Sequence, residues 1–229
     1  MLDKKNFYIN GKWISPVEPK AYKVINPSNE EPCAEISIGG KKDVDKAVSA
    51  AKKAFETWAF TKKEERLELL EKLYVIYKKR WAEMAKLITL EMGAPMKFST
   101  EMQAATGASH IKSFKNILKD FKFEKDLGEE KNNQKLLYEP KGVCALITPW
   151  NWPINQVNLK VIPALAAACT VVLKPSEIAP LSSMLLAEMI DEVNFPAGVF
   201  NLVNGDGAIT GDALTSHPDV NMISFTGST

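Results

Sequence analysis

The pattern of hydrophobic and polar positions divides the chain into stretches of different secondary structure. The segments FYINGKWI and KAYKVINPS near the amino terminus are short, contain Gly or Pro at their turns, and are typical of strands. From Asp43 onward, apolar residues recur every three to four positions, which predicts an amphipathic helix that reaches Trp58. The apolar face of this helix consists of Val44, Ala47, Val48, Ala51, Ala54 and Phe55.

Two more helices are predicted in the first half of the chain. Thr61 and Glu64 have the spacing of a capping box, which predicts the start of a long helix there. This helix continues to Gly93, which together with the proline two residues later interrupts it. Another helix is expected over about residues 99–120, and it should be interrupted or weakened near Gly107.

The character of the chain changes twice after this helix. Residues 122–141 are charged and polar, with alternating fragments around the turn-rich string DLGEEKNN, and they predict a β-hairpin that leaves the main body. From Gly142 onward, the strand-like segments GVCALIT, TVVLK, GVFNLV and NMISFTG alternate with the helical segments PINQVNLKVIPALAAA, LSSMLLAEMIDEV and DALTSH. Strands that alternate with helices indicate βαβ units. We therefore expect an α/β fold with a parallel sheet, flanking helices and a protruding β-hairpin.

Composition and charge exclude several classes of function. The 229 residues are 45% hydrophobic and 25% charged, which is ordinary for a globular protein. The net charge of +1 provides no strong field for nucleic acid or for an anionic membrane. The amino terminus lacks the apolar core of a signal peptide, and the apolar run of residues 161–173 is too short to span a bilayer. A cytoplasmic protein that binds neither nucleic acid nor membrane is expected.

Cysteines and histidines do not form a pattern typical of a disulfide framework or a metal site. Cys33, Cys144 and Cys169 are odd in number and lack paired spacing, and the last two are expected to be small core residues. His110 and His217 lie far apart in the sequence without companion ligands. No bound metal is therefore expected.

Four of the predicted strands and their exits carry polar or glycine-rich strings: TPWNWP, KPSE, NGDG and FTGST. In parallel sheets, ligands bind beyond the carboxyl ends of the strands. We therefore expect the four strings to gather at one edge of the sheet. Their convergence is more informative than any one of them.

Two of the strings are weak signals of phosphate binding when taken alone. Gly205, Gly207 and Gly211 follow a strand, but their spacing is one residue longer than that of the dinucleotide fingerprint, and no acidic residue follows about twenty positions later. An ordinary glycine-rich turn is favoured over a fingerprint. Gly227, Ser228 and Thr229 stand where a helix should begin, and the backbone amides and hydroxyls of such a start can bind phosphate. Serine and threonine are also common as plain helix caps.

The string KPSE has two interpretations. Lys174 ends a strand, and the following proline stiffens the exit so that Ser176 and Glu177 project outward. A carboxylate at this place can accept both hydroxyls of a ribose, and an ammonium can donate to the same sugar. Alternatively, Glu177 forms an ion pair and stabilises the first turn of a helix. The residues alone leave both open.

The string ITPWNWP, residues 147–153, surrounds one amide with two prolines and two tryptophans. Pro153 suits an early helical position, so Asn151 could cap the helix that follows. Capping explains an asparagine but does not explain the tryptophans. The other interpretation is an amide donor aimed at a developing oxyanion, with its backbone fixed by the prolines and its rotamer fixed by the aromatic rings.

Taken together, ITPWNWP, Lys160, PALAAACTVVLKPSE, GVFNLVNGDG and SFTGST resemble the amino-terminal half of the aldehyde dehydrogenase superfamily. The resemblance covers essentially the whole chain, including the INGKW and NPS segments and a helical region written EEPCAEISIGGKKDVDKAVSAAKKAFETW. It is strongest to bacterial NAD-linked enzymes for aliphatic or semialdehyde substrates. It implies an incomplete fold of that superfamily: a Rossmann-like cofactor-binding domain from residues 1–121 and 142–229, an oligomerisation hairpin over residues 122–141, and no catalytic domain.

The resemblance also implies roles for individual residues. Asn151 corresponds to the oxyanion-stabilising amide, and Lys160 to a lysine close to the active site. The implied cofactor is NAD, with NADP as an alternative. The implied cofactor contacts are Ile147, Thr148, Pro149 and Trp150 on the nicotinamide side, Lys174 and Glu177 at the adenosine ribose with Ser176 beside them, Gly207 and Gly211 near the adenine, and Gly227 and Ser228 near the pyrophosphate with Phe225 before them. Trp152, Gln156 and Leu159 fall where the superfamily lines its aldehyde tunnel.

One departure from the superfamily is decisive. Its enzymes attack the aldehyde with a cysteine in a Gly-Gln-x-Cys type segment, assisted by a glutamate in a Leu-Gly-Gly-Lys type segment, and neither segment occurs here. Two functions therefore compete. The chain is either part of a complete NAD-dependent aldehyde dehydrogenase, homodimeric or homotetrameric and inactive as this piece alone, or a non-catalytic nucleotide-binding or oligomerisation module. A hydroxy-acid or alcohol dehydrogenase is disfavoured because no matching glycine fingerprint or catalytic pattern appears.

Overall fold

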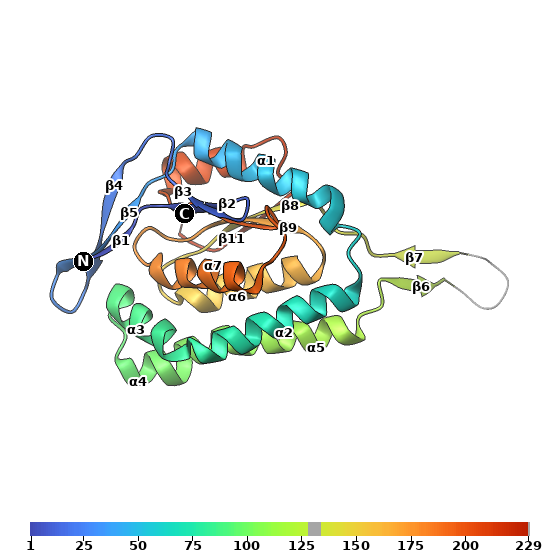
Figure 1. Ribbon diagram of the computed structural model, residues 1–229, viewed down its shortest axis with the longest axis horizontal. Coiled ribbons are helices and arrows are strands. Elements are labelled where there is room, and N and C mark those ends of the chain that lie inside the picture. Colours follow the sequence, from blue (N-terminus) through green and yellow to red (C-terminus); the bar gives the residue numbers. More distant parts are fainter. Residues whose placement is uncertain (128–133, 229) are drawn as a thin grey trace.

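A six-stranded sheet forms the centre of the computed structural model, which describes residues 1–127 and 134–228 (Figure 1). Within these residues the strand order is β11-β8-β9-β10-β2-β3. The first four strands are parallel, and the β2–β3 hairpin adds two antiparallel strands at the edge. The strands are β2 (Phe7–Ile9), β3 (Lys12–Ile14), β8 (Val143–Ile147), β9 (Thr170–Lys174), β10 (Phe200–Leu202) and β11 (Met222–Phe225). The predicted Rossmann-like parallel sheet is confirmed, with an antiparallel extension.

Helices cover both faces of this sheet. Side chains alternate along β8, so that Ala145 lies on the face of the sheet covered by α1, and Leu146 lies on the face covered by α6 and α7. Figure 1 shows α1 on one side of the sheet, α6 and α7 on the other, and α2 with α5 as a further layer. Both faces of β8 and β9 are buried as a result, as is usual for parallel strands. The helices are α1 (Lys41–Trp58), α2 (Lys63–Lys79), α5 (Ala104–Asp120), α6 (Pro153–Ala166), α7 (Leu181–Val193) and the short α8 (Asp212–Thr215).

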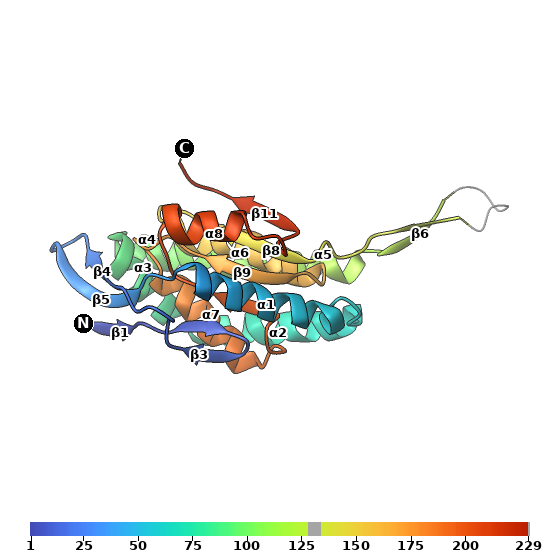
Figure 2. The same ribbon diagram turned by 90° about the horizontal axis from the view of Figure 1, so that it is seen from above.

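Two smaller β-structures lie at opposite ends of the molecule (Figures 1 and 2). One is a three-stranded sheet of β1 (Leu2–Lys4), β5 (Glu31–Ser37) and β4 (Ala21–Asn26). The other is the predicted hairpin, formed by antiparallel β6 (Glu124–Asp126) and β7 (Lys135–Leu137). The centre of the turn-rich string, residues 128–133, lies outside the described residues.

Several predicted boundaries differ from the observed ones. The segment at β5 is a strand and not part of a helical region, because it pairs with β4 and β1. The Thr61–Glu64 capping box is wrong: α2 begins at Lys63, and the Thr61 hydroxyl donates to the Trp58 carbonyl at the end of α1. The long second helix breaks at Arg80, after which α3 (Trp81–Met92) continues to Gly93 in the left-handed conformation.

The helix expected over residues 99–120 also differs in detail. It is preceded by α4 (Met96–Phe98) and a π-helical segment, η1 (Ser99–Gln103). Gly107 lies inside α5, which is not interrupted there. A side chain there would clash with Tyr77, so this glycine allows the close approach of α2 and α5.

Candidate functional site

The four strings gather at one place, as predicted. A cleft of about 540 Å³ opens beyond the carboxyl ends of β8, β9 and β11. A smaller hollow of about 350 Å³ shares part of its wall and extends to Gly211 on a second π-helical segment, η2 (Gly207–Gly211). The cleft is lined by Ile147, Thr148, Pro149, Trp150, Asn151, Gln156, Lys174, Ser176, Glu177, Gly207, Phe225, Thr226, Gly227 and Ser228. Most of the proposed cofactor contacts are therefore brought together.

Lys174 fixes the floor of this cleft. Its ammonium, nearly buried, donates to the carbonyls of Gly205 at 2.5 Å and Pro175 at 3.1 Å. It also lies 3.5 Å from the Glu177 carboxylate, whose side chain is 26% exposed. Burial lowers the pKa of Lys174, and the neighbouring Glu177 opposes that shift. The lysine thus links the end of β9 to the glycine-rich turn and keeps the carboxylate at the cleft wall.

The helix-start interpretation of Glu177 is not supported by the contacts. Helix α7 begins four residues later, at Leu181. The backbone amides of Leu181 and Ser182 donate to the buried carboxylate of Glu91, on α3. The ion pair with Lys174 is present, but the start of α7 is stabilised by a different carboxylate.

Asn151 lies at the rim of the cleft and does not cap α6. The N-cap position belongs to Trp152, and no side chain caps this helix. In the described part of the chain, the exposed Asn151 amide makes no hydrogen bond. Trp152 packs edge-to-face on Phe98 at 5.5 Å between ring centroids, whereas Trp150 is half-exposed in the cleft wall. The predicted aromatic frame is therefore one-sided, because among the described residues Trp152 has an aromatic neighbour and Trp150 has none.

The glycine-rich turn behaves as a turn and not as a fingerprint. The Asp206 carboxylate accepts hydrogen bonds from the backbone amides of Ile209 at 2.7 Å and Thr210 at 3.4 Å, and so caps η2. A side chain at Gly205 would clash with Thr210, so packing requires glycine there. A side chain at Gly207 would meet no protein atom, since its Cα faces open space beside the cleft.

Three predicted residues, on α6 or at its N-cap, lie outside the cleft lining. Leu159 is exposed and Trp152 is half-buried. The Lys160 ammonium donates to the Ser224 hydroxyl on β11 at 2.8 Å, and burial lowers the pKa of this lysine. Thr226 lines the cleft but was not singled out in the sequence, although it lies within the FTGST string.

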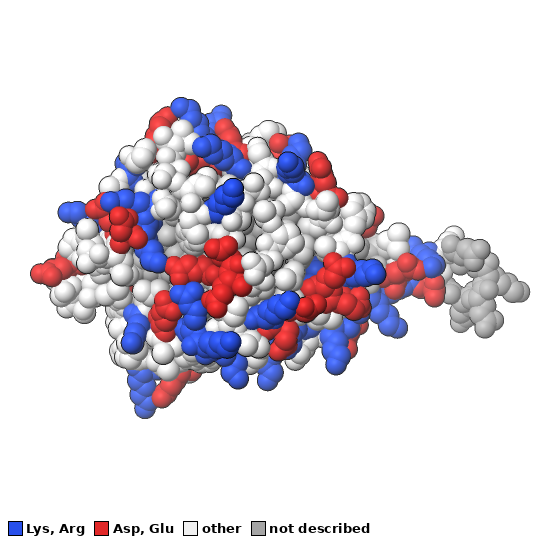
Figure 3. All heavy atoms as spheres, in the orientation of Figure 1, with Lys and Arg blue, Asp and Glu red and all other residues white. Residues whose placement is uncertain are grey.

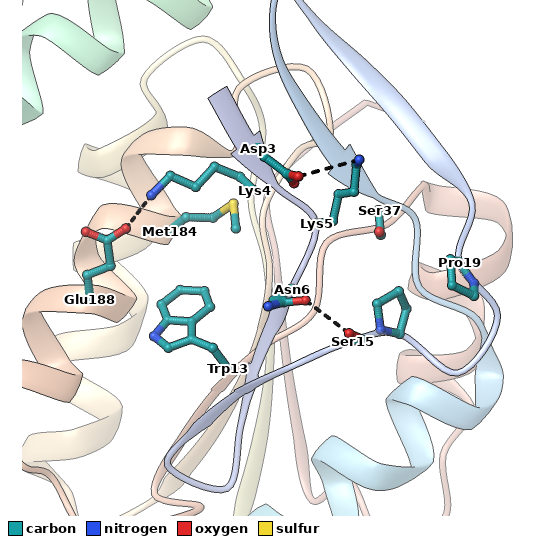
Figure 4. Close-up of a pocket in the computed structure, with 11 residues that line it drawn as sticks. Asp3, Lys4, Lys5, Asn6, Trp13, Ser15, Pro19, Ser37, Met184 and Glu188 are labelled. Atoms are coloured by element: carbon teal, nitrogen blue, oxygen red, sulfur yellow. Dashed lines mark hydrogen bonds and ion pairs between the residues drawn. The ribbon is translucent and has the colours of Figure 1, made fainter. Parts of the chain in front are cut away.

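A second cavity, of about 600 Å³, lies among the amino-terminal strands and α7 (Figure 4). Its charged groups satisfy one another: Lys4 pairs with Glu188 at 2.6 Å, and Lys5 with Asp3 at 3.6 Å. None of the four strings reaches this cavity. Its size alone does not make it a candidate site.

The surface carries basic and acidic side chains side by side, as Figure 3 shows for one face. Residues 1–127 and 134–228 contain no group of three or more His, Cys, Asp or Glu side chains that could hold a metal ion. No helix among them is long and apolar enough to cross a membrane. Cys144 and Cys169 are buried in the core, as expected, on the α6–α7 side of the sheet.

Comparison with known proteins decides the family. Residues 13–229 match the sequence model described as the aldehyde dehydrogenase family. The chain belongs to this family. It is 50% identical over its whole length to a 3-succinoylsemialdehyde-pyridine dehydrogenase of a Pseudomonas species, and 43% identical over 96% of its length to a putative aldehyde dehydrogenase of Staphylococcus epidermidis.

Solved structures of aldehyde dehydrogenases have the same fold. The chain superposes with a TM-score of 0.97 and 58% identity on an aldehyde dehydrogenase of Bartonella henselae, covering 100% of this chain and 48% of that one. The TM-score is 0.92, with 43% identity, against a mutant of aldehyde dehydrogenase C of Pseudomonas syringae in complex with NAD+ and octanal, covering 96% and 44%. The chain spans about half the length of the curated relatives it matches, namely 47% and 46% of the two named above. The aldehyde dehydrogenase fold is thus incomplete in this chain.

Proposed function

We propose that this chain supplies the cofactor cleft and the oxyanion donor of an NAD-dependent aldehyde dehydrogenase, which oxidises an aldehyde to a carboxylic acid. The observation that carries the proposal is the arrangement of the Asn151 amide, the Lys174–Glu177 pair and Gly207 around one cleft. A hydrogen-bonding amide suits a developing oxyanion, and a carboxylate suits ribose hydroxyls. The named relatives act on aldehydes, which supports the same substrate class here.

The residues present fit a dinucleotide. Glu177 keeps part of its carboxylate accessible in the cleft wall, and Gly207 leaves room where a side chain would intrude. When bound, NAD accepts a hydride from the aldehyde carbon. Lys174 and Glu177 would hold the adenosine ribose, with Ser176 beside them. Ile147, Thr148, Pro149 and Trp150 would border the nicotinamide, Gly207 and Gly211 the adenine, and Phe225, Gly227 and Ser228 the pyrophosphate.

Asn151 is assigned the chemical role closest to the reacting carbon. Its amide NH2 has two donors, and none of them is engaged within the described residues. Lys160 lies on α6 with Gln156 and Leu159, and its ammonium is held by Ser224. Gln156, Leu159 and the N-cap Trp152 would line the aldehyde tunnel. The nucleophilic cysteine and the assisting glutamate that the family resemblance implies would come from segments other than residues 1–229.

The hairpin is proposed to join subunits of the complete enzyme into a homodimer or homotetramer. It projects from residues 1–121 and 142–228, which make up the body of the described chain (Figure 2). Leu136, Leu137 and Tyr138 are exposed on it, and a hollow of about 450 Å³ at its base contains Phe60 and Phe123. Apolar side chains on a projecting hairpin favour contact with another subunit. A cytoplasmic location remains a prediction from composition.

The test compares residues 1–229 with a polypeptide that extends them to the length of the relatives. The extended protein is expected to form NADH with short aliphatic aldehydes. Residues 1–229 alone are expected to show no turnover but to bind NAD, and the binding is measured by the quenching of tryptophan fluorescence, to which Trp150 in the cleft wall contributes. Absence of NADH formation by the extended protein, together with retained NAD binding, would favour a non-catalytic module instead. Turnover by residues 1–229 that disappears in Cys144→Ala or Cys169→Ala would show that the buried thiols are not structural.

A further inference from the structure

The cavity of about 600 Å³ among the amino-terminal strands and α7 has polar groups in its lining that lack partners within the described part of the chain (Figure 4). Ser37, at the end of β5, is only 1% exposed, and its hydroxyl makes no hydrogen bond there. The indole N–H of Trp13, on β3, is also without a partner among these residues. So is the amide NH2 of Asn6, whose oxygen accepts from the Ser15 hydroxyl at 3.3 Å. Three hydrogen-bond donors are therefore left over in the lining of one cavity.

The charged groups of the lining are already paired. The Lys4 ammonium lies 2.6 Å from the Glu188 carboxylate. The Lys5 ammonium lies 2.7 Å from Glu35 and 3.6 Å from Asp3. An anionic ligand would be repelled by these carboxylates and would compete with them for the ammonium groups. A ligand without net charge therefore fits the lining better than an anion.

The remaining lining is apolar and includes an aromatic ring. Met184 and Pro16 are buried, and Trp13 is partly buried. The Trp13 ring packs against Tyr8 at 5.3 Å between ring centroids, which limits its rotation. An indole held in this way offers a flat surface on which a planar ligand can stack. The volume of the cavity lies within the range of about 300–1,000 Å³ that is usual for small-molecule sites.

We propose that this cavity binds an uncharged small molecule with a flat apolar body and a carbonyl-type acceptor, such as an aromatic amide or ketone. The Trp13 ring packs against the flat body, and the Ser37 hydroxyl and the Asn6 amide donate hydrogen bonds to the acceptor. The cavity shares no lining residue with the cofactor cleft. It is therefore a second site, and it does not depend on the proposed aldehyde oxidation.

The test measures the binding of benzamide and benzoate to the complete polypeptide by isothermal titration calorimetry. The two molecules have nearly the same size and shape, but benzoate carries a negative charge. Benzamide is expected to bind at one site in this cavity and about tenfold more tightly than benzoate. Ser37→Ala is expected to raise the Kd for benzamide about fivefold to tenfold, as expected for one net hydrogen bond. Trp13→Leu, which removes the flat ring, should raise it at least as much.

The control separates this cavity from the cleft, where a flat amide could also bind. Trp150→Leu changes the cleft wall and should leave the Kd for benzamide unchanged, as should saturating NAD. If Trp150→Leu or NAD abolishes the binding while Ser37→Ala does not change it, benzamide binds in the cleft and the proposal is overturned. Absence of binding at about 10 mM benzamide, or equal Kd values for benzamide and benzoate, would also overturn it. Should Ser37→Ala fail to fold, Asn6→Ala, at an exposed position, gives the same comparison.

Discussion

The carboxylate of Glu177 lies 3.5 Å from the ammonium of Lys174, which is itself anchored on the carbonyl of Gly205. This anchoring holds a negative charge at the cleft wall where the adenosine ribose is proposed to bind. A free ribose hydroxyl can donate to that carboxylate, whereas a 2′-phosphate would be repelled by it. Glu177 is therefore expected to favour NAD over NADP.

In the complete enzyme, Glu177→Ser is expected to shift the ratio of kcat/KM for NAD over NADP toward NADP by about tenfold, the equivalent of about 1.4 kcal/mol. Steady-state kinetics with both cofactors measure it. Glu192→Ser, which removes an exposed carboxylate from α7 outside the cleft, is the control and should leave the ratio unchanged. A native preference for NADP, or an unchanged ratio in Glu177→Ser, would refute the role of this carboxylate.

Gly107 is expected to tolerate no side chain. A Cβ atom there would clash with the Tyr77 hydroxyl, which is buried and donates to the Ala104 carbonyl at 2.9 Å. Gly107→Ala should therefore lower the free energy of unfolding by about 1–3 kcal/mol, as overpacking does. Gly40→Ser is the control, because a Cβ there meets no atom and serine suits the N-cap of α1. Urea unfolding measures both, and equal stabilities would contradict the clash.

Local pattern was sufficient for the elements whose surroundings are simple. The bounds of β9 and α7 follow from the sequence, because one is a continuous apolar run and the other has an uninterrupted helical period. The carboxyl-edge cleft was also predictable, since strand order in a βαβ fold brings the exits of parallel strands together. Each of the four strings is a weak signal alone, but the strand order places residues of all four around one cleft.

The remaining features depend on partners far away in the chain. The break at Arg80 coincides with an ion pair to Glu188 on α7, which no local pattern shows, in addition to the local pair with Glu83. The pairing of His110 with Asn155 likewise needs the packing of α5 on α6. The prediction of a capping box at Thr61 failed for the opposite reason. The spacing to Glu64 is that of a capping box, but the Thr61 hydroxyl donates to Trp58 at the end of the preceding helix.

Glu91 is expected to make stability depend on pH. Burial raises the pKa of this carboxyl to about 7 from its usual 4.5, and the hydrogen bonds from Ser182 and Leu181 limit the shift. Between these two values the folded state binds a proton that the unfolded chain does not. The free energy of unfolding should therefore be highest below about pH 4.5 as far as Glu91 is concerned, and fall by about 3 kcal/mol as the pH rises through 7.

The measurement is urea unfolding at several pH values between 5 and 8 for wild type and Glu91→Gln. In Glu91→Gln, which lacks the titrating group, the free energy of unfolding should change less with pH. This variant is expected to be less stable than wild type at all pH values, because an amide offers only one acceptor oxygen to the start of α7. Identical slopes in the two proteins would show that Glu91 does not titrate in this range.

The hairpin prediction can be tested through a single exposed leucine. Leu137 on β7 is 57% exposed, and a carboxylate in its place would be buried unpaired in a subunit contact. Leu137→Glu in the complete enzyme should weaken association by about 2 kcal/mol or more. Sedimentation velocity should then show a smaller species. Val75→Glu, at an exposed apolar position on α2, is the control, and equal sedimentation of both variants and wild type would argue against the hairpin as an interface.

Asn151 separates catalysis from architecture. Its side chain neither caps α6 nor makes a hydrogen bond within the described residues, so Asn151→Ala should change the melting temperature little. If the amide stabilises an oxyanion, its loss should raise the barrier by about 2.7–4 kcal/mol, which is a fall in kcat of about 10²–10³. The complete enzyme is needed for this comparison.

The matched control is Asn116→Ala, an exposed asparagine on α5 away from the cleft, which should change neither kcat nor melting. A destabilised Asn151→Ala protein with nearly normal kcat would mean that Asn151 has a structural role and no catalytic one. The one-sided aromatic frame makes the expected result sharper: since Trp150 is half-exposed and only Trp152 is packed, there is little local packing for Asn151 to support. Within the described residues its amide has no hydrogen-bond partner and lies at the cleft, so a loss of rate without a loss of stability is the expected outcome.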